Sequence, residues 1–292
     1  MMRRQALFLG CVLPLRFPGI ELAARRVFGQ LGVPCVDLEG YSCCPEPVVL
    51  GLADRELALA VSARNLALAE RADADLTVMC NGCYETLAEA DATLRHDAGA
   101  RARVAQLLDG IGTRYEGGVR IKHFVELLHE DVGVARIAEQ VTTPVDVTVA
   151  VHYGCHLFRE VEHEDTRRKP RMLRALIEAA GARVVDYGLE DLCCGFPISQ
   201  FDKRAAMQER LLPKLRALGA TSAEAVLFCC PACLNQFESG QGAAGDLAAD
   251  VPRYPCVHIL ELLALAFGMR PAELHLDARF APSREFVDCF WG

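Results

Sequence analysis

The sequence predicts an α/β fold of two similar Rossmann-like halves, each built on a mainly parallel sheet. Short apolar runs alternate with amphipathic helical stretches, as in a chain of strand–helix units. The same landmarks also occur twice and in the same order: Cys11 and Cys155, Cys43 and Cys193, Cys80 and Cys230, His123 and His258. Their offsets of 144, 150, 150 and 135 residues are close to half of the 292-residue chain. We interpret this pattern as an internal duplication.

Apolar periodicity and helix-ending residues predict the elements of the first half. Gly32, for example, follows an apolar helical stretch at the place where a C-terminal glycine is expected. The predicted elements are, in order, strand 5–9, helix 19–31, strand 33–38, helix 55–71, strand 76–79, a helix from residue 84, and helix 122–130. Residues 91–118 form a charged stretch that we leave without a defined element.

The second half repeats this order. Its predicted elements are strand 145–151, helix 170–180, strand 183–187, helix 202–218 and strand 225–228. We place the boundary near residues 140–144, which divides the chain into domains 1–142 and 143–292. In parallel sheets, ligands gather at the carboxyl ends of the strands. Because the cysteine groups follow predicted strands, we expect them to meet on one rim.

Composition excludes several classes of protein. Apolar residues make up 52% and charged residues 24%, which is typical of a globular chain, and the net charge of −8 argues against nucleic acid as a main partner. No apolar run is long enough to span a membrane. Residues 3–15 resemble a signal peptide, but a similar apolar run ending in Gly-Cys recurs at 149–155, so we expect a cytoplasmic protein. Fourteen cysteines in that compartment indicate metal ligands or redox groups rather than disulfides.

Each half carries five cysteines at matching spacing: Cys11, Cys43, Cys44, Cys80 and Cys83, then Cys155, Cys193, Cys194, Cys230 and Cys233. The gap before the adjacent pair is 31 residues in the first half and 37 in the second, and the gap after it is 35 in both. Zinc takes four ligands in a structural site, so five thiolates exceed its need. Iron–sulfur clusters accept varied sets of thiolates, and adjacent cysteines with diverging side chains suit separate metals of an opened cluster. We favour iron–sulfur, with zinc and catalytic dithiols as alternatives.

The pattern of Cys, Cys-Cys and Cys-x-x-Cys, which occurs twice, resembles that of the cysteine-rich CCG family. The length of the chain and its internal duplication resemble those of the heterodisulfide reductase B-subunits, which are members of this family. The resemblance covers essentially the whole chain. It implies two noncubane [4Fe-4S] clusters, each held by the five cysteines of one half, with a disulfide substrate binding between them. It also implies reductive cleavage of that disulfide, with each sulfur captured at one cluster, or thiol oxidation in the reverse direction. The substrate would be the coenzyme M–coenzyme B disulfide or a carrier-bound group such as lipoyl.

One departure from the family pattern is Pro45, which follows Cys44 where Gly195 follows Cys194. Proline has no backbone N–H to offer a cluster sulfur, so the first site is expected to differ in potential. The sequence contains no GxGxxG fingerprint, no P-loop and no cubane ferredoxin motif. We therefore expect electrons to pass through partner subunits, one ferredoxin-like and one containing flavin. The alternative is a non-catalytic CCG-type electron-transfer subunit of a glycolate, lactate or succinate dehydrogenase-like complex.

Several residues outside the cysteine motifs also have predicted roles. His156, next to Cys155, is the candidate catalytic residue, as a proton donor to a departing thiolate. His123 and His258 are interpreted as helix caps, and His152 as a structural residue. Three of the remaining cysteines, Cys35, Cys256 and Cys289, are interpreted as structural thiols, and Cys229 as a residue of the strand before Cys230. Two cations near the first cysteine of each half, Arg16 and Arg159, are candidates to attract an anionic substrate. The basic run of Arg167, Arg168 and Lys169 is interpreted as a solvated helix start.

Overall fold

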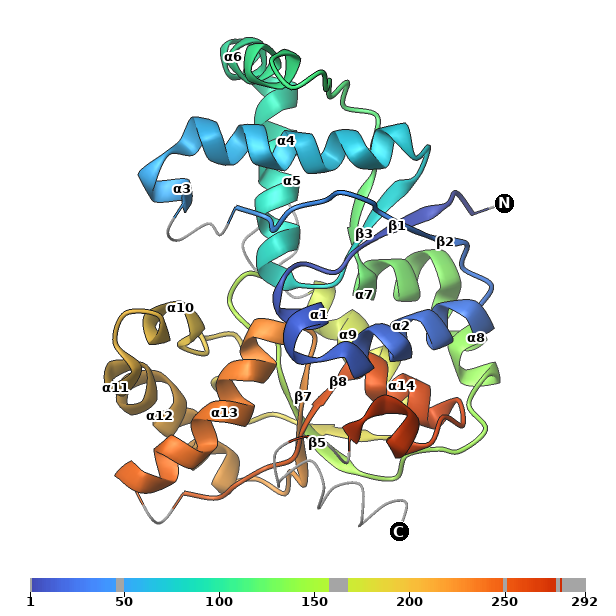
Figure 1. The fold of residues 1–292 in the computed structure, drawn as a ribbon. Coiled ribbons are helices and arrows are strands. Elements are labelled where there is room, and N and C mark those ends of the chain that lie inside the picture. Colours follow the sequence, from blue (N-terminus) through green and yellow to red (C-terminus); the bar gives the residue numbers. More distant parts are fainter. Residues whose placement is uncertain (1, 46–49, 158–167, 249–250, 277–278, 280–292) are drawn as a thin grey trace.

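The computed structural model describes residues 2–45, 50–157, 168–248, 251–276 and 279, and it contains two parallel sheets of four strands each (Figure 1). The first sheet has the order β2-β1-β3-β4 and consists of β1 (Gln5–Phe8), β2 (Cys35–Asp37), β3 (Asp75–Val78) and β4 (Ile121–His123). The second sheet has the order β6-β5-β7-β8 and consists of β5 (Thr148–His152), β6 (Arg183–Val185), β7 (Ala225–Phe228) and β8 (Cys256–His258). The identical order confirms the predicted α/β fold with two similar halves.

Helices connect the strands of the first half. They are α1 (Val12–Arg16), α2 (Pro18–Gln30), α3 (Leu50–Ala53), α4 (Arg55–Arg71), α5 (Asn81–His96), α6 (Ala98–Asp109), α7 (Phe124–Glu126), a π-helix (Leu127–Gly133) and α8 (Val134–Glu139). Side-chain caps define two of the starts, because the carboxylates of Asp54 and Asp97 accept hydrogen bonds from the backbone of α4 and α6.

The helices of the second half follow a similar course. They are α9 (Arg168–Ala179), α10 (Phe196–Ser199), α11 (Lys203–Ala205), a π-helix (Ala206–Leu211), α12 (Leu212–Gly219), α13 (Pro231–Leu247), α14 (Ile259–Ala266) and a short 3-10 helix (Pro271–Leu274). Asp202 caps α11 through its side chain, at the residue where the sequence predicts this helical region to begin.

The structure corrects two parts of the element prediction. Lys122 and His123 lie in the strand β4 rather than at the start of a helix, which begins at Phe124. The strands β4 and β8 have three residues each, too few to show the alternation by which a strand is found in a sequence. The charged stretch after residue 91 is also more ordered than expected, since α5 continues through it and α6 follows.

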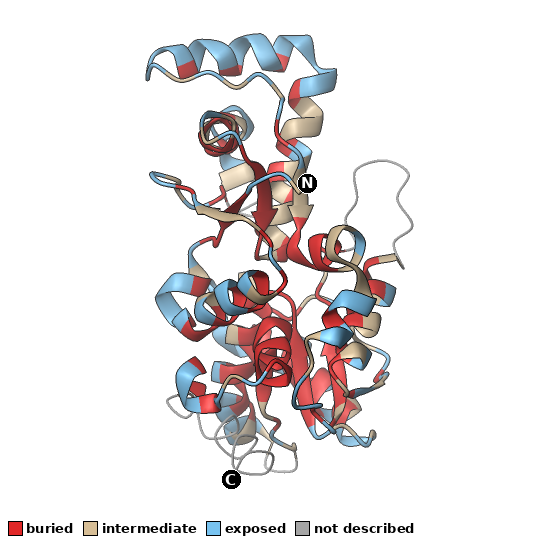
Figure 2. Cartoon of the chain, turned by 90° about the vertical axis from the view of Figure 1, so that its right-hand side faces the viewer, coloured by how far each residue is buried: buried red, intermediate tan, exposed pale blue. Residues whose placement is uncertain are grey.

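One buried hydrophobic cluster spans both halves. Helix α14 of the second half packs against α2 of the first, and the buried cluster joins Val27 and Phe28 to Leu262 and Leu263 (Figures 1 and 2). The approach is close at Gly19, where an added Cβ would lie 2.0 Å from the carbonyl oxygen of Leu274. Within the described part of the chain, we find no helix with the length and apolar character needed to cross a membrane.

Candidate metal centre

All ten predicted ligand cysteines lie just beyond the carboxyl ends of strands. In the first half, Cys11 follows β1, the pair Cys43 and Cys44 follows β2, Cys80 caps α5 after β3, and Cys83 lies in the first turn of that helix. The second half repeats these places after β5, β6 and β7 with Cys155, Cys193, Cys194, Cys230 and Cys233. The shared sheet order therefore gathers each set of five on one rim, as the sequence predicts.

Two equivalent glycines make room for the sulfur atoms. Gly10 and Gly154 precede the first cysteine of each half and have φ values of +71° and +75°, which glycine adopts readily. An added Cβ would lie 3.0 Å from Cys83 Sγ at Gly10 and 3.1 Å from Cys233 Sγ at Gly154. A side chain at either position would therefore press on a cysteine sulfur, so both sites depend on the missing Cβ.

Sulfur atoms contact one another within each set. Cys44 Sγ lies 2.9 Å from Cys83 Sγ. In the second half, Cys194 and Cys233 are the matching pair, and their thiols interact in the same way. The two sets differ in exposure. In the first set Cys44 and Cys83 are buried and Cys11 and Cys43 are exposed, whereas in the second set Cys194, Cys230 and Cys233 are buried and Cys155 and Cys193 are half-buried. The described cysteines form no disulfide, so these contacts join separate thiols.

The two sets meet at Cys80 and Cys230, whose Sγ atoms lie 3.7 Å apart. These residues occupy equivalent N-cap positions of α5 and α13. The side chain of Asn81, next to Cys80, donates a hydrogen bond of 2.7 Å to the carbonyl oxygen of Tyr153 in the second half. Contacts between thiols consequently form an array that crosses from one half to the other, through Cys44, Cys83, Cys80, Cys230, Cys233, Cys194, Cys193 and Cys155. Cys11 contacts Cys43.

Contacts between the thiols shift their pKa values in opposite directions. The pKa of Cys193 is lowered chiefly because the thiols of Cys155 and Cys194 donate hydrogen bonds to its sulfur. Hydrogen bonds from Cys233 and Cys80 likewise lower the pKa of Cys230. The surroundings of these two thiols therefore favour the thiolate, which is the form that binds metals.

Gly195 and Pro45 differ in what their backbones offer. Gly195 has a φ of +93°, and its N–H donates a hydrogen bond of 3.4 Å to Cys193 Sγ. Pro45 has no N–H to place beside Cys43. The two cysteine sets therefore have different polar surroundings despite their equal spacing.

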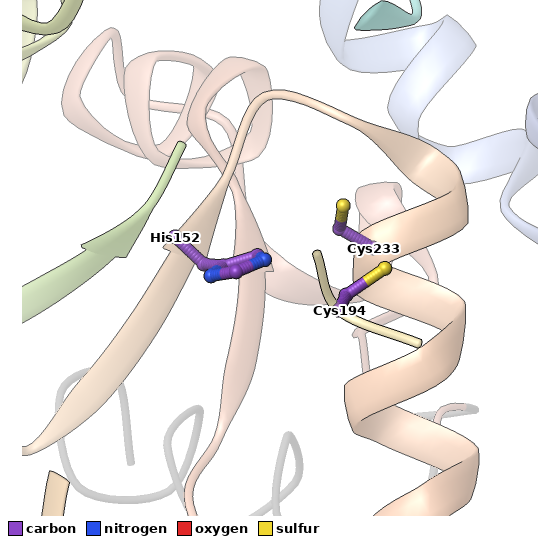
Figure 3. A group of neighbouring side chains, drawn as sticks. All are labelled: His152, Cys194 and Cys233. Atoms are coloured by element: carbon purple, nitrogen blue, oxygen red, sulfur yellow. The ribbon is translucent and has the colours of Figure 1, made fainter. Parts of the chain in front are cut away.

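Three buried histidines surround the array. His123 and His258 accept hydrogen bonds at Nδ1 from Val125 N and Leu260 N, at 3.4 and 3.3 Å, so they are helix caps as predicted. Burial lowers the pKa of both to about 3, which keeps them neutral. His152 is in strand β5, as expected, but its ring also lies beside Cys194 and Cys233, with the ligand atoms of all three within 4.8 Å of one another (Figure 3).

His156, the candidate catalytic residue, follows Cys155 and pairs through Nδ1 with the carboxylate of Glu85 on α5. Only 15% of the His156 side chain and 9% of the Glu85 side chain are exposed. This pair joins the two halves, and the carboxylate holds the imidazole in one orientation. The sequence contains no local signal for Glu85, because 71 residues separate the partners.

The other candidates have mixed outcomes. Cys35 is half-buried in β2, and Cys256 is buried in β8 beside Gln241. Cys229 lies one residue past β7 rather than in it, where its Sγ is 3.5 Å from Asn81 Oδ1. Arg16 is exposed. Arg159, Arg167 and Cys289 lie outside the described residues.

A helix does begin at Arg168, as expected, but the expectation that this start is solvated is wrong. Lys169 is 1% exposed, and its Nζ lies 4.4 Å from the centre of the Tyr84 ring. Arg168 forms ion pairs with Glu126 and Glu130. These contacts bring α9 against the first half, which the local charge pattern does not reveal.

The donor set fits an iron–sulfur group. Each half presents five cysteine sulfur atoms. The thiolate form is favoured at Cys193 and Cys230, and Gly10 and Gly154 leave space beside the sulfur atoms. The buried Nε2 of His152, which has no hydrogen-bond partner in the described structure, also lies at the second set. Soft thiolate ligands in this number suit iron–sulfur clusters better than a four-coordinate ion.

Comparisons with known proteins agree with this site. The model of the cysteine-rich domain family CCG matches residues 5–88 and 149–238, which include all ten cysteines. The chain is 36% identical over 289 residues to the B-subunit of the ferredoxin/F(420)H(2)-dependent CoB-CoM heterodisulfide reductase of Methanosarcina acetivorans, covering 98% of this chain and 96% of that protein. It is 35% identical over 292 residues to the B-subunit of the ferredoxin:CoB-CoM heterodisulfide reductase of Methanosarcina mazei, with the same two coverages of 98% and 96%.

Two further relatives are more distant. The 8-methylmenaquinol:fumarate reductase membrane anchor subunit of Wolinella succinogenes is 28% identical over 280 residues, covering 95% of this chain and 96% of that protein. A hypothetical protein from Helicobacter pylori has a similar fold, with a TM-score of 0.73 and 14% identity, and the match covers 96% of this chain and 52% of that one. Both CCG domains and the near full-length identity show that the chain belongs to the family of cysteine-rich CCG proteins that includes the heterodisulfide reductase B-subunits.

Proposed function

We propose that this chain is the catalytic iron–sulfur subunit of a heterodisulfide-reductase-like complex, in which a disulfide is cleaved between two noncubane [4Fe-4S] clusters. Family membership supports the coarser function of an iron–sulfur electron-transfer subunit. The observation that carries the finer proposal is the 3.7 Å contact between Cys80 Sγ and Cys230 Sγ. It makes the two five-cysteine sites neighbours, so one substrate with two sulfur atoms can reach both.

The reaction balances as a two-electron reduction. The S–S bond of the substrate breaks, and two electrons from partner subunits with two protons from solvent or side chains give two thiols. Iron–sulfur clusters, when bound, supply one-electron transfer and iron atoms with affinity for sulfur. The ten cysteines, five from each half, hold them: Cys11, Cys43, Cys44, Cys80, Cys83, Cys155, Cys193, Cys194, Cys230 and Cys233. The same residues serve thiol oxidation, in which all these transfers run backwards.

His156 is the proposed proton donor to one of the product thiolates. It lies next to Cys155, and the Glu85 carboxylate orients its ring. We expect His156→Gln to slow disulfide cleavage by about 100-fold or more, as loss of a general acid does, and to leave the iron content unchanged. A His156→Gln protein with full turnover would remove this residue from the mechanism.

The relatives' names support partner subunits, since each is a subunit of a larger reductase. We propose a ferredoxin-like iron–sulfur subunit and a flavin-containing subunit as the electron donors, in the cytoplasm. The division into domains 1–142 and 143–292 is proposed on the repeat, because each range contains one sheet and one cysteine set.

A second function is favoured by one observation: the relative from Wolinella succinogenes is named a membrane anchor subunit of a fumarate reductase. In that function the clusters would pass electrons between other subunits and cleave no disulfide. The two complete cysteine sets support the catalytic function, because a simple electron carrier needs one site.

The test begins with anaerobic iron and acid-labile sulfide analysis, for which we expect about eight of each per chain. The purified protein is then given an artificial one-electron donor and a disulfide, and released thiol is measured. Stoichiometric zinc with negligible iron would overturn the iron–sulfur proposal. Full iron content, efficient electron transfer to a redox partner and no cleavage of the coenzyme M–coenzyme B or lipoyl disulfides would favour the second function.

A further inference from the structure

The two halves differ at one equivalent position of their central strands. Phe8 ends β1 and His152 ends β5, and each lies three residues before the first cysteine of its half. Their registers match, since Phe8 pairs with Val78 of β3 and His152 pairs with Phe228 of β7. Phe8 packs in the buried cluster that contains Cys44 and Cys83, just as His152 lies beside Cys194 and Cys233. A hydrocarbon ring in the first site is thus replaced by an imidazole in the second.

The ring of His152 packs against the rings of Phe228 and Phe237 and contacts the hydroxyl of Tyr187. It is fully buried, and its ring centre lies 5.0 Å from that of Phe237. Its Nδ1 lies 2.7 Å from the Oη of Tyr187. A neutral imidazole carries one N–H, on either Nδ1 or Nε2. In the first half, Tyr41 packs on Phe8 at 5.0 Å instead and donates its hydroxyl to the Gly10 carbonyl at 3.3 Å.

The contact with Tyr187 assigns the tautomer. Among the described residues, the Tyr187 hydroxyl has Nδ1 of His152 as its hydrogen-bond partner. If the hydroxyl donates its proton to Nδ1, the hydroxyl has an acceptor and Nδ1 has a donor. The imidazole proton then lies on Nε2, which is buried and has no partner in the described structure. A buried donor without an acceptor destabilises the fold, so such an atom calls for an explanation. In Figure 3 the ring points toward the side of the site where Cys194 and Cys233 lie.

We propose that His152 Nε2–H donates a hydrogen bond to a sulfur of the second cluster and holds that cluster at a higher reduction potential than the first. The inference rests on the proposed clusters. The Gly195 N–H, 3.4 Å from Cys193 Sγ, acts in the same direction. At the equivalent positions of the first half, the side chain of Phe8 and the backbone of Pro45 have no N–H to offer. Hydrogen bonds to cluster sulfurs are one of the protein's means of setting potential, because they stabilise the more negative, reduced state.

This asymmetry gives the pair of sites an order of reduction. The first electron from a partner would come to rest at the second cluster, and the first cluster would be reduced after it. His152 is therefore a tuning residue, whereas the ten cysteines are ligands. Tyr187 has a supporting part, since its hydroxyl keeps the imidazole proton on Nε2.

The test compares four anaerobically purified, cluster-loaded proteins: wild type, His152→Phe, His152→Gln and Tyr187→Phe. A redox titration followed by EPR is expected to give two midpoint potentials in the wild type. His152→Phe, which installs the residue of the first half, should lower the upper potential and leave the lower one unchanged. His152→Gln keeps an N–H and should restore part of the shift, and Tyr187→Phe should lower the upper potential by a smaller amount.

A second measurement separates donation from ligation. With ¹⁵N-labelled histidine, pulsed EPR should show a weak nitrogen coupling to one reduced cluster in the wild type and none in His152→Phe. A strong coupling, or loss of half of the iron in His152→Phe, would identify His152 as a ligand and overturn the proposal. Unchanged potentials in both His152→Phe and His152→Gln would also overturn it. Wild-type protein without iron would instead overturn the proposed function.

Discussion

The side chain of Asn81 donates a hydrogen bond of 2.7 Å to the carbonyl oxygen of Tyr153, and this bond joins the first cysteine site to the second. Asn81 is the residue after Cys80, and Tyr153 lies two residues before Cys155. Cys229 Sγ also lies 3.5 Å from Asn81 Oδ1 and 3.6 Å from Tyr153 O. The Asn81 amide therefore helps to hold the two sites together.

We predict that Asn81→Ala lowers the free energy of unfolding by about 1–3 kcal/mol, because it removes a buried hydrogen bond to the Tyr153 carbonyl. Urea denaturation monitored by circular dichroism measures the change. Asn65→Ala is the matched control: Asn65 is also buried but bonds to Ser42 within the first half. Only Asn81→Ala should also disturb the Cys80–Cys230 contact, seen as a change in the magnetic interaction between the clusters. Equal spectra in both variants would contradict the bridging role.

Single replacements in either cysteine set should affect one cluster. We predict that Cys44→Ser or Cys194→Ser lowers the iron content from about eight to about four atoms per chain, since each removes a ligand from one five-cysteine set. Cys35→Ser is the control, because Cys35 is a half-buried thiol of β2 outside both sets. Iron and sulfide analysis measures the effect. Loss of all iron from both single variants would show that the two sets hold one shared metal centre.

The positions of the cysteines in the fold could be predicted, because each position depends on residues that are close in the sequence. Each motif follows a strand, and parallel strands place their carboxyl ends together, so the repeat alone brings Cys11, Cys43 and Cys80 to one rim. The cap assigned to His123 could be predicted for the same reason, since its partners Val125 and Glu126 are neighbours in the chain.

Residues joined by distant contacts could not be found in this way. Glu85 and His156 are 71 residues apart, and Asn81 and Tyr153 are 72 apart. Their pairing depends on how the two sheets are placed, which no local pattern encodes. The burial of Lys169 was missed because its basic neighbours suggest solvent, whereas the packing of α9 places it over Tyr84.

Because His123 and His258 are buried, we predict a steep loss of stability in mild acid. Burial lowers the pKa of His123 and His258 from 6.5 to about 3, so below pH 6.5 the unfolded chain binds protons that the folded chain does not. Each histidine should therefore cost the fold about 1.4 kcal/mol per pH unit as the pH falls below 6.5. Glu261, whose pKa burial raises to about 7, acts in the opposite direction between pH 7 and 4.5.

The double variant His123→Asn/His258→Asn isolates this effect, because asparagine is a good N-cap and does not titrate. In urea denaturation from pH 7.5 to 5.5, the pH dependence of the double variant should be smaller than that of the wild type, by an amount that grows to about two protons at the acid end of this range. The control is His275→Asn, because His275 is exposed and has a φ of +54°, a conformation that asparagine tolerates. The interpretation fails if the double variant and the wild type lose stability in parallel.

The buried ion pair between Arg279 and Glu261 should be the most sensitive contact outside the cysteine sites. Arg279 Nη2 lies 2.6 Å from Glu261 Oε1, its Nη1 donates a 3.0 Å hydrogen bond to the Cys256 carbonyl, and its guanidinium lies 4.9 Å from the Phe17 ring centre. The side chains are 9% and 0% exposed. Removing the arginine therefore leaves a carboxylate with no access to water.

We predict that Arg279→Met lowers the free energy of unfolding by about 3–5 kcal/mol at pH 8, the usual cost of an uncompensated buried charge. The cost relative to wild type should shrink at pH 6, because burial already raises the pKa of Glu261 to about 7 and loss of the arginine raises it further, so the carboxyl becomes neutral. The double variant Arg279→Met/Glu261→Gln should recover most of the stability, since glutamine can still accept the bond from His258 N. Urea denaturation of the three proteins at both pH values measures this. A pH-independent cost, undiminished in the double variant, would assign the loss to the packing of Arg279 on Phe17 rather than to charge.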